Sequence, residues 1–435
     1  MIILYRFNNK YIMNILKTKY IYIYNMINEE NIYENGGNAS GSESDQDKEG
    51  KTTYTPEEFE KWDDLNLNPN LLRGIYAYGF ETPSPIQKKS IKTFIDRKDL
   101  IAQAQSGTGK TGAFTVGILQ SIDVTKNSTQ AMVLSPTREL TTQIYDVIKT
   151  LGHFIKGLKV QTLVGGTEID TDMEQLKNNT PHIIVGCPGR THDMLRRRAI
   201  NNNAIGMVVL DEADEMLSSG FKEQIYNIFQ YLNKDVQLCL FSATVPNEIL
   251  ALSSKFMRDP IKILVKSEML SLEGISQFFI ALDTDQDKYV TLKDIYARIA
   301  ASQCIIYCNS VKRVKDLTDA MTGDGFAVVC IHSGMDKADR STAYAGFKSG
   351  KDRVLISSNV TARGIDIQQV RTVINFDIPK CVHTYLHRIG RSGRWGRKGV
   401  GINFVTRRDL KYLKTIEQHY NTQIEELPES FITDV

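Results

Sequence analysis

The sequence has very little net charge. Its 53 basic side chains stand against 51 acidic ones, so the formal charge over 435 residues is only +2. Bulk charge therefore gives no sign of a nucleic-acid partner, and any basic surface has to be local. No apolar run approaches the ~20 residues of a membrane span, and the longest amino-terminal run, MIILY, is too short for a secretory signal. We expect no membrane partner and no secretion.

Cysteine is also scarce, and its spacing excludes the common zinc and disulfide classes. No CxxC pair and no histidine at zinc spacing accompanies the six cysteines, Cys187, Cys239, Cys304, Cys308, Cys330 and Cys381. Most of them lie within apolar runs, which is typical of buried, reduced thiols. We therefore predict a reducing compartment, the cytoplasm or the nucleus.

The first 53 residues differ in composition from the remainder. Residues 1–25 contain no acidic residue, whereas residues 26–50 contain seven acidic residues and one lysine. Such a polar, acidic segment cannot bury enough apolar surface to fold, and we predict a disordered tail. Two interpretations of the leader stay open, a functional segment or a natural start at Met26. The ordered chain is expected to begin near Tyr54.

Short β-branched runs alternate with helical stretches in the rest of the chain. Because these runs are apolar without alternation, they are typical of parallel strands that helices cover on both faces. Eight such strands are predicted, at 131–136, 182–188, 207–213, 238–244, 303–309, 328–333, 353–359 and 371–377. A single core stops growing near ~250–300 residues. We therefore predict an α/β protein with two parallel-sheet lobes, residues 54–265 and 275–435, joined by a polar linker at 266–274.

The strongest motif is a phosphate-binding loop, AQSGTGKT, directly after the apolar run DLIAQA. It matches GxxxxGK[ST] except at its first position, and it comprises Ala104, Gln105, Ser106, Gly107, Thr108, Gly109, Lys110 and Thr111. Gly107 and Gly109 let the backbone curl so that N–H groups point at phosphate oxygens. Lys110 is placed to reach the β- and γ-phosphates, and Thr111 to bind Mg²⁺. The alternative, a Gly-Ser loop with a chance lysine, leaves the flanking strand and helix unexplained.

An acidic motif, VVLDEAD, completes this site. Asp211 ends an apolar strand, which is where a phosphate-loop enzyme holds Mg²⁺. Glu212 is placed to orient or deprotonate the water that attacks the γ-phosphate, and Asp214 follows on the next turn. The structural alternative is a solvated acidic helix start. Beside the phosphate loop, the motif predicts hydrolysis of a nucleoside triphosphate.

The segment Asp211–Asp214, DEAD, resembles the signature of the DEAD-box RNA helicases of superfamily 2. Further blocks match in the same order: GFETPSPIQ (79–87), PTREL (136–140), GG (165–166), PGR (188–190), SAT (242–244), ARGID (362–366) and HRIGRSGR (387–394). The resemblance covers about residues 54–435 and is strongest to the translation-initiation and exon-junction branches. It implies two RecA-like lobes, RNA-stimulated ATP hydrolysis, a monomer, and partners of the initiation-factor scaffold or exon-junction type.

The resemblance also implies residue roles at the nucleotide. Gln87 would read the adenine edge, because its amide donates and accepts at once. Trp62 would stack on the base where the family usually has Phe, although a core anchor is the alternative. Phe80 is assigned to the same region, and Gly364 and Asp366 to the ribose.

In the second lobe, Arg391 is assigned to the γ-phosphate and Arg394 to the finger that stabilises the transition state. Catalysis would then require the lobes to close; an RNA-contacting basic loop is the alternative. Ser242 and Thr244 could bond Asp214 or His387 and so couple ATP to RNA. Contacts mainly to the RNA sugar-phosphate backbone are assigned to Pro136, Thr137, Arg138, Gly165, Gly166, Pro188, Gly189, Arg190, Arg340 and Ser358.

Several residues depart from the family pattern along the expected RNA path. Cys187 stands where Thr is usual, Lys337 replaces Gln, and Ser358 with Asn359 replaces Thr-Asp. Two functions of different classes remain: an ATP-driven RNA unwindase in translation initiation or mRNA processing, and an ATP-locked RNA clamp that acts mainly as an assembly platform. A DNA helicase or general phosphate-loop ATPase is disfavoured, because GFETPSPIQ and DEAD occur together.

Overall fold

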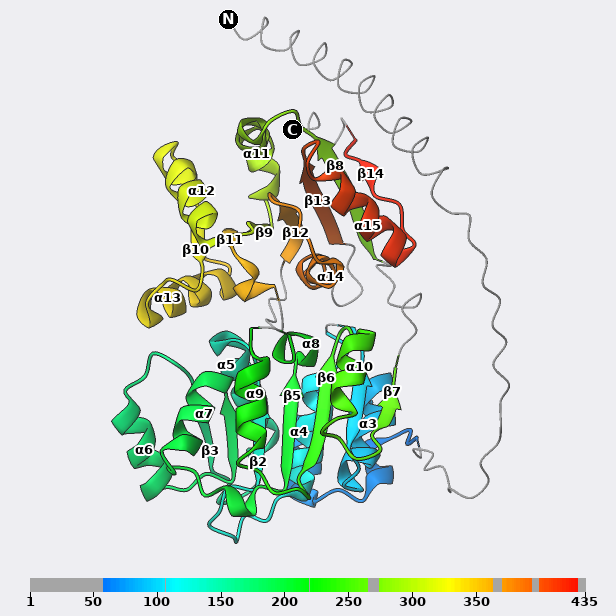
Figure 1. Ribbon diagram of the computed structural model, residues 1–435, viewed down its shortest axis with the longest axis vertical. Helices are drawn as coiled ribbons and strands as arrows, with labels where there is room; N and C mark the ends of the chain where they lie inside the picture. Colours follow the sequence, from blue (N-terminus) through cyan, green and yellow to red (C-terminus); the bar gives the residue numbers. More distant parts are fainter. Residues whose placement is uncertain are drawn as a thin grey trace, which may run out of the picture.

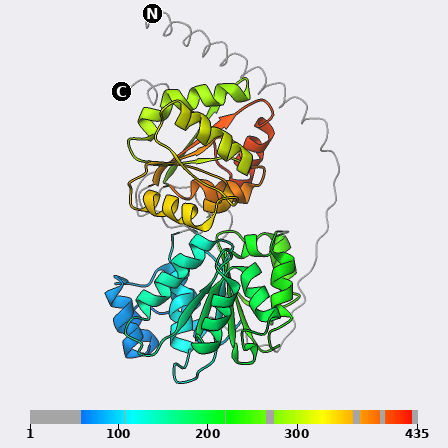
Figure 2. The same ribbon diagram turned by 90° about the vertical axis from the view of Figure 1, so that its left-hand side faces the viewer.

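The computed structural model describes residues 58–105, 107–218, 220–264, 274–362, 370–392 and 399–428. The predicted acidic tail and nearly all of the predicted linker lie outside these residues, as do four predicted site residues, Ser106, Gly364, Asp366 and Arg394. The described chain forms two lobes, one above the other in Figure 1, and the turned view in Figure 2 keeps them separate.

The first lobe is built on a seven-stranded sheet in which all neighbouring strands are parallel. Its order is β3-β4-β2-β5-β6-β1-β7. The strands are β1 (Leu100–Gln103), β2 (Ala131–Leu134), β3 (Val160–Leu163), β4 (Ile183–Gly186), β5 (Met207–Asp211), β6 (Gln237–Ser242) and β7 (Ile261–Ile263). The inner strands are buried throughout, as expected where helices cover both faces of a sheet.

The second lobe repeats this plan, with the strand order β10-β11-β9-β12-β13-β8-β14 and parallel pairs throughout. Its strands are β8 (Ile275–Ala281), β9 (Gln303–Tyr307), β10 (Val329–Ile331), β11 (Val354–Ser357), β12 (Val370–Asn375), β13 (Gly399–Val405) and β14 (Glu425–Glu426). The fold is thus the predicted pair of parallel-sheet lobes.

Helices cover both faces of each sheet (Figure 1). In the first lobe they are η1 (Trp62–Leu65), α2 (Pro69–Ala77), α3 (Pro85–Ile95), α4 (Lys110–Ser121), α5 (Arg138–Leu151), α6 (Ile169–Asn178), α7 (Pro188–Arg196), η2 (Asn202–Ala204), α8 (Ala213–Met216), α9 (Lys222–Phe229) and α10 (Asn247–Ser253). In the second lobe they are α11 (Asp285–Ile299), α12 (Val311–Gly323), α13 (Lys337–Lys348), η4 (Asn359–Thr361), α14 (Val382–Ile389) and α15 (Leu410–Tyr420). Within the described residues, no helix has both the length and the apolar character needed to cross a membrane.

Strand β2 illustrates why such apolar runs form these strands. Val133 packs into the core on one face of the sheet, whereas Met132 and Leu134 pack into the core on the other. Because successive side chains of a strand point to opposite faces, a run without polar residues fits only a sheet that is covered twice. Each sheet accordingly has two hydrophobic cores.

All eight predicted strands are present, and each ends two residues earlier than predicted. The strands end earlier because the last two residues of each apolar run already belong to the connecting segment or to the start of the next helix. Helices near these connecting segments face the opposite lobe, since Glu139 on α5 and Asp214 on α8 contact Arg340 on α13 and His387 on α14. The carboxyl-terminal edges of the two sheets therefore meet across the gap between the lobes.

Candidate active site between the lobes

The phosphate loop connects β1 to α4. Gly107 and Gly109 have φ values of 83° and 98°, a region that glycine enters without strain. Gly109 caps α4, and Lys110 is the first residue of that helix. The buried Lys110 ammonium donates to the carbonyl oxygens of Ala104 (2.7 Å) and Gln105 (3.0 Å), so it lies over the curled backbone. A positive side chain and a helix amino terminus thus converge where phosphate groups would be held.

Asp211 and Glu212 occupy the end of β5 and the turn after it. Both carboxylates are buried, at 3% and 2% exposure. Burial and the neighbouring Glu212 charge raise the pKa of Asp211 to about 7. Glu212 itself has a φ of 53°, a left-handed conformation that costs a non-glycine residue about 1 kcal/mol or more. The turn therefore holds the Glu212 carboxylate in place at the expense of local strain.

A divalent cation fits this acidic turn. Glu212 Oε2 is buried without a hydrogen-bond partner among the described residues. Two neighbouring buried carboxylates need positive charge nearby, and hard cations such as Mg²⁺ prefer oxygen ligands of this kind. A second grouping brings ligand atoms of Glu212, Asp214 and His387 within 4.8 Å of one another. Its Asp214 oxygens are already used by hydrogen bonds, which leaves Asp211, next to the unpartnered Glu212 oxygen, as the better carboxylate to bind a cation.

Asp214 is the point at which the two lobes meet. Ser242 Oγ and Thr244 Oγ1 donate to its two carboxylate oxygens at 2.9 and 2.7 Å. His387 Nε2, on α14 of the second lobe, lies 2.9 Å from Asp214 Oδ2. All four side chains are buried. The structure thus brings together the four residues predicted to couple the lobes, through one shared carboxylate.

Arg391 lies one helical turn beyond His387, at the end of α14, and is 2% exposed. Its Nε donates to the His387 carbonyl oxygen at 3.2 Å. Because His387 Nδ1 is 3.8 Å from Glu212 Oε2, this end of α14 lies beside the acidic turn. A buried arginine of the second lobe is therefore hydrogen-bonded to the backbone of His387, the residue that contacts Asp214 and approaches Glu212.

The residues predicted to bind the base lie at the start of α4, with one correction. Gln87 Nε2 donates to the Gly109 carbonyl oxygen at 3.2 Å, and Phe80 borders the same turn. Trp62 is fully buried, and its ring stacks on Phe80 with centroids 6.3 Å apart. The prediction that Trp62 itself stacks on a base is therefore wrong for this structure, since no ring face is open. The partly exposed Phe80 presents the outer ring, and Trp62 supports it from the core.

Three loops predicted to contact RNA follow the adjacent strands β2, β4 and β3 and so gather at one edge. Thr137 caps α5 by accepting from the Leu140 N–H at 3.3 Å. Gly166 has a φ of 88°, and a Cβ there would lie 3.1 Å from Nη1 of Arg138. The positive φ favours glycine here, and a larger residue would also have to displace the Arg138 guanidinium. Pro188 and Gly189 open α7, and Gly189 is exposed.

Two predicted RNA-binding arginines have other partners. Arg190 forms a buried ion pair with Asp172 and donates to the Thr167 carbonyl oxygen at 2.7 Å. Arg340, on α13, makes a bidentate, buried ion pair with Glu139 on α5. The assignment of both guanidiniums to RNA phosphates is therefore not what the structure shows. Arg190 fastens α7 to α6, and Arg340 fastens the second lobe to the first.

Ser358 and Asn359 also differ from their predicted place along the RNA path. Ser358 is 8% exposed, so it offers little surface to a ligand. Asn359 Oδ1 accepts from Nε and Nη2 of the fully buried Arg388, at 2.9 and 2.7 Å. Asn309 and Asn375 complete the side-chain partners of this guanidinium. Asn359, which replaces the usual Asp, therefore helps to hold Arg388 and with it α14, the helix that bears His387.

Sequence reasoning missed Glu139 and Asp172. Glu139 stands inside the PTREL block, and a carboxylate in the first turn of a helix is normally explained by the helix dipole. Asp172 lies in the first turn of α6 and has the same ordinary explanation. Neither position carries a sequence signal that reveals its buried arginine partner, which lies 201 positions away for Glu139 and 18 for Asp172.

The fold and this site define a class of protein: a two-lobed ATPase in which one lobe holds the phosphate loop and acidic turn, and the other contributes histidine and arginine. Residues 84–252 match the family model of the DEAD/DEAH box helicases, and residues 287–396 match the helicase conserved C-terminal domain. The chain belongs to the DEAD/DEAH box helicase family. By family it is an ATP-hydrolysing helicase.

Relatives extend over most of the chain. The ATP-dependent RNA helicase eIF4A of Schizosaccharomyces pombe is 50% identical over 87% of this chain and 96% of its own. Eukaryotic initiation factor 4A of Caenorhabditis elegans is 51% identical over 85% of this chain and 92% of its own. Among solved structures, Saccharomyces cerevisiae Dbp5 bound to RNA and ADP BeF3 superposes with a TM-score of 0.79 and 33% identity, covering 84% of this chain and 95% of Dbp5.

Proposed function

We propose that this protein is an RNA-stimulated ATP-dependent RNA helicase that acts in translation initiation. The observation that carries the proposal is the contact of His387 with Asp214 beside the phosphate loop. It completes one site from two lobes, so a ligand that draws the lobes together also assembles the site. Support for the RNA substrate and for translation comes from the relatives that are named RNA helicase and initiation factor.

In this proposal the first lobe holds the nucleotide. Lys110 binds the β- and γ-phosphates, and Gln87 with Phe80 holds the base near the start of α4. Thr111 and Asp211 hold Mg²⁺, which neutralises phosphate charge when bound. Glu212 orients the attacking water and accepts its proton, a role that suits a buried carboxylate with an unused oxygen.

The second lobe supplies positive charge to the transition state. Arg391 is buried and hydrogen-bonded to the backbone of His387, which approaches the acidic turn, and in our proposal it reaches the γ-phosphate. Arg394 is assigned the finger role and lies outside the described residues. Because both arginines and His387 belong to the second lobe, hydrolysis depends on the closed arrangement.

RNA is proposed to bind along the loops that follow β2, β3 and β4. Their exposed glycine backbone and Arg138 suit sugar-phosphate contacts, which carry little sequence information. The relatives' names favour turnover by a helicase over the alternative, an ATP-locked clamp that acts as an assembly platform. Pathway partners of the initiation-factor type, a monomeric state and the domain limits 54–265, 266–274 and 275–435 belong to the same proposal.

A cytoplasmic, reducing setting is part of this proposal. All six cysteines are free thiols in the structure, which is compatible with such a compartment. The relatives named initiation factors support the cytoplasm rather than the nucleus.

The test is ATP turnover of the full chain with RNA and with DNA of the same sequence, followed by strand separation of a short RNA duplex. We expect RNA, but not DNA, to stimulate turnover, and unwinding to require hydrolysable ATP. Stimulation by DNA equal to that by RNA, or RNA binding without turnover, would refute the helicase proposal.

A further inference from the structure

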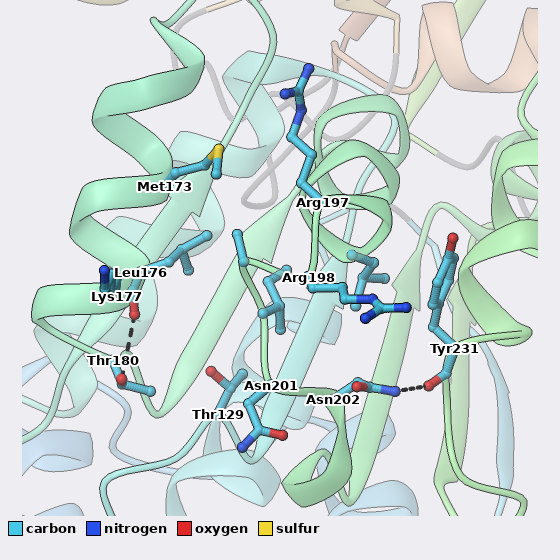
Figure 3. Close-up of a pocket in the computed structure, with 13 residues that line it drawn as sticks. Thr129, Met173, Leu176, Lys177, Thr180, Arg197, Arg198, Asn201, Asn202 and Tyr231 are labelled. Carbon is cyan, nitrogen blue, oxygen red and sulfur yellow. Dashed lines mark hydrogen bonds between the residues drawn. The ribbon is translucent and has the colours of Figure 1, made fainter.

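A cavity of about 800 Å³ opens on the first lobe, away from the nucleotide site (Figure 3). Its walls come from α6, the end of α7 with the loop that follows it, and the turn after α9. Thr129, which also lines it, lies two residues before β2, whereas the site residues follow the strands. The cavity therefore lies at the amino-terminal edge of the sheet, opposite to the edge that faces the second lobe.

The cavity combines an apolar lining with positive charge. Leu176, Leu195 and Ile200 contribute buried apolar side chains. Lys177 and Arg198 are exposed at its wall, and no ion-pair partner of either is found within the described part of the chain. No carboxylate is among the described lining residues. An occupant should therefore offer acidic groups next to one or two apolar side chains.

Not all of the cations at this wall are equivalent. Arg197 is paired with Asp193, whose carboxylate lies 2.8 Å from its Nε, and in Figure 3 it points away from the other labelled side chains. Arg198 reaches toward Tyr231 in the same view, while Lys177 stands on the opposite wall. Lys177 and Arg198 are thus the two cations of this wall that have no ion-pair partner among the described residues.

Arg198 holds a backbone conformation that its side chain does not favour. Its φ is 57°, in the left-handed region, at the point where α7 ends. The N–H groups of Arg198 and Ala199 close this turn on the carbonyl oxygens of Leu195 and Met194, both at 2.9 Å. Glycine is the usual residue at such a helix end. Glycine at position 198 would form this turn with less backbone strain, but it would remove the Arg198 guanidinium from the cavity wall.

The chain itself contains a segment with the matching chemistry. Within its acidic stretch, Glu29, Glu30 and Glu34 flank the apolar pair Ile32 and Tyr33. We propose that residues 29–34 dock into this cavity of their own first lobe, with Ile32 and Tyr33 on the apolar lining and the glutamates at Lys177 and Arg198.

The length of chain outside the described residues allows this. Residue 34 precedes residue 58, the first described one, by 24 positions. Glu58 pairs with Lys89 of α3, on the other face of the sheet from the cavity, so the segment has to pass around the lobe. A fully extended chain of that length reaches about 80 Å, well beyond the ~30 Å width of a seven-stranded sheet. Because the segment is tethered, its effective concentration at the cavity is on the order of millimolar, so weak contacts suffice. This inference does not depend on the proposed helicase function.

Photo-crosslinking in the full chain tests the proposal. Tyr231 is replaced by p-benzoylphenylalanine, which keeps an aromatic ring at the cavity wall, and linked peptides are identified by mass spectrometry after irradiation. We expect links to residues 29–34, formed within one copy when isotopically labelled and unlabelled chains are mixed. Links only to other segments, or mainly between labelled and unlabelled copies, would overturn the proposal.

Variants separate binding from structure. Lys177→Glu with Arg198→Glu should lower the crosslink yield about tenfold, equivalent to about 1.4 kcal/mol, whereas Lys149→Glu on the exposed side of α5 should leave it unchanged. Arg198→Gly is the sharpest variant, because it relieves the backbone strain while removing the guanidinium. It should raise the thermal midpoint and still reduce the yield. An unchanged yield in Arg198→Gly would show that the cavity does not hold the segment through this charge.

Discussion

Arg340 of the second lobe holds Glu139 of the first through both carboxylate oxygens, and the two side chains are only 8% and 7% exposed. The pair is formed between residues 201 positions apart, at the edge where the loops after β2 and β10 meet. Because the two residues belong to different lobes, separating the lobes would break the pair and expose both charges to water. The pair therefore stabilises the closed arrangement of the lobes and does not contribute to the folding stability of either lobe alone.

The first prediction concerns this pair. Arg340→Ala leaves a buried carboxylate without its partner, which costs about 3–5 kcal/mol, and the cost falls on the closed form alone. RNA-stimulated ATP turnover should fall by about 100-fold or more, with the thermal midpoint of the free protein unchanged. Lys348→Ala, at the exposed end of the same helix, is the control. Replacing both Arg340 and Glu139 by leucine should recover part of the lost activity; equal turnover in Arg340→Ala and the wild type would disprove the role of the pair.

A second prediction concerns Glu212. Glu212→Gln keeps the size of the side chain and removes the negative charge that takes up a proton. Hydrolysis should fall by about 10²–10⁴-fold, while ATP-dependent RNA binding, measured by fluorescence anisotropy, persists. The complex of protein, ATP and RNA should then dissociate slowly, because without hydrolysis the lobes stay closed on both ligands. A Glu212→Gln protein that turns over ATP normally would show that another group activates the water.

The third prediction follows from Arg388. Burial lowers the pKa of this arginine to about 10, so it stays charged at neutral pH and folding bears the cost of desolvating it. This loss of folding stability is fully present while the pH is below the pKa of Arg388 in the folded protein, and it decreases only as the pH rises above that pKa. Asn359→Asp brings a carboxylate to the same nitrogens, and because Asn359 is itself exposed, the new charge needs little desolvation.

Asn359→Asp should therefore stabilise the second lobe by about 1 kcal/mol, which raises its unfolding midpoint by about 2–4 °C. Calorimetry at pH 7 measures the shift, and Asn203→Asp, at an exposed position of the first lobe, serves as the control. A lowered midpoint in Asn359→Asp would mean that the asparagine network is better adapted to Arg388 than a carboxylate is.

Much of the fold follows from the sequence, because a strand covered on both faces must be apolar at every position. That rule found most of the inner strands, among them β2, β5 and β9, but not β8. It failed at β3 and β7, which lie toward the sheet edges and are only partly buried. It also failed at β13, whose run is interrupted by Gly401 and Asn403.

The site was predictable where the chemistry is local. The phosphate loop and the acidic turn are each built from adjacent residues, so the sequence alone located Lys110 and Glu212 at this site, and their roles stay predictions. Partner choice across the fold was not predictable. Arg190 and Arg340 have the same residue type as phosphate-binding arginines, and only the positions of Asp172 and Glu139 show that both are already paired.

The most direct test of the central claim, that neither lobe holds a complete site, is RNA-stimulated ATP turnover by residues 54–265 alone. This fragment keeps Lys110, Asp211 and Glu212 but lacks His387 and Arg391. We predict that it binds ATP weakly and shows no RNA-stimulated hydrolysis, since loss of arginine fingers typically costs ~10³–10⁵ in rate. RNA-stimulated turnover by the fragment at the rate of the full chain would contradict the account.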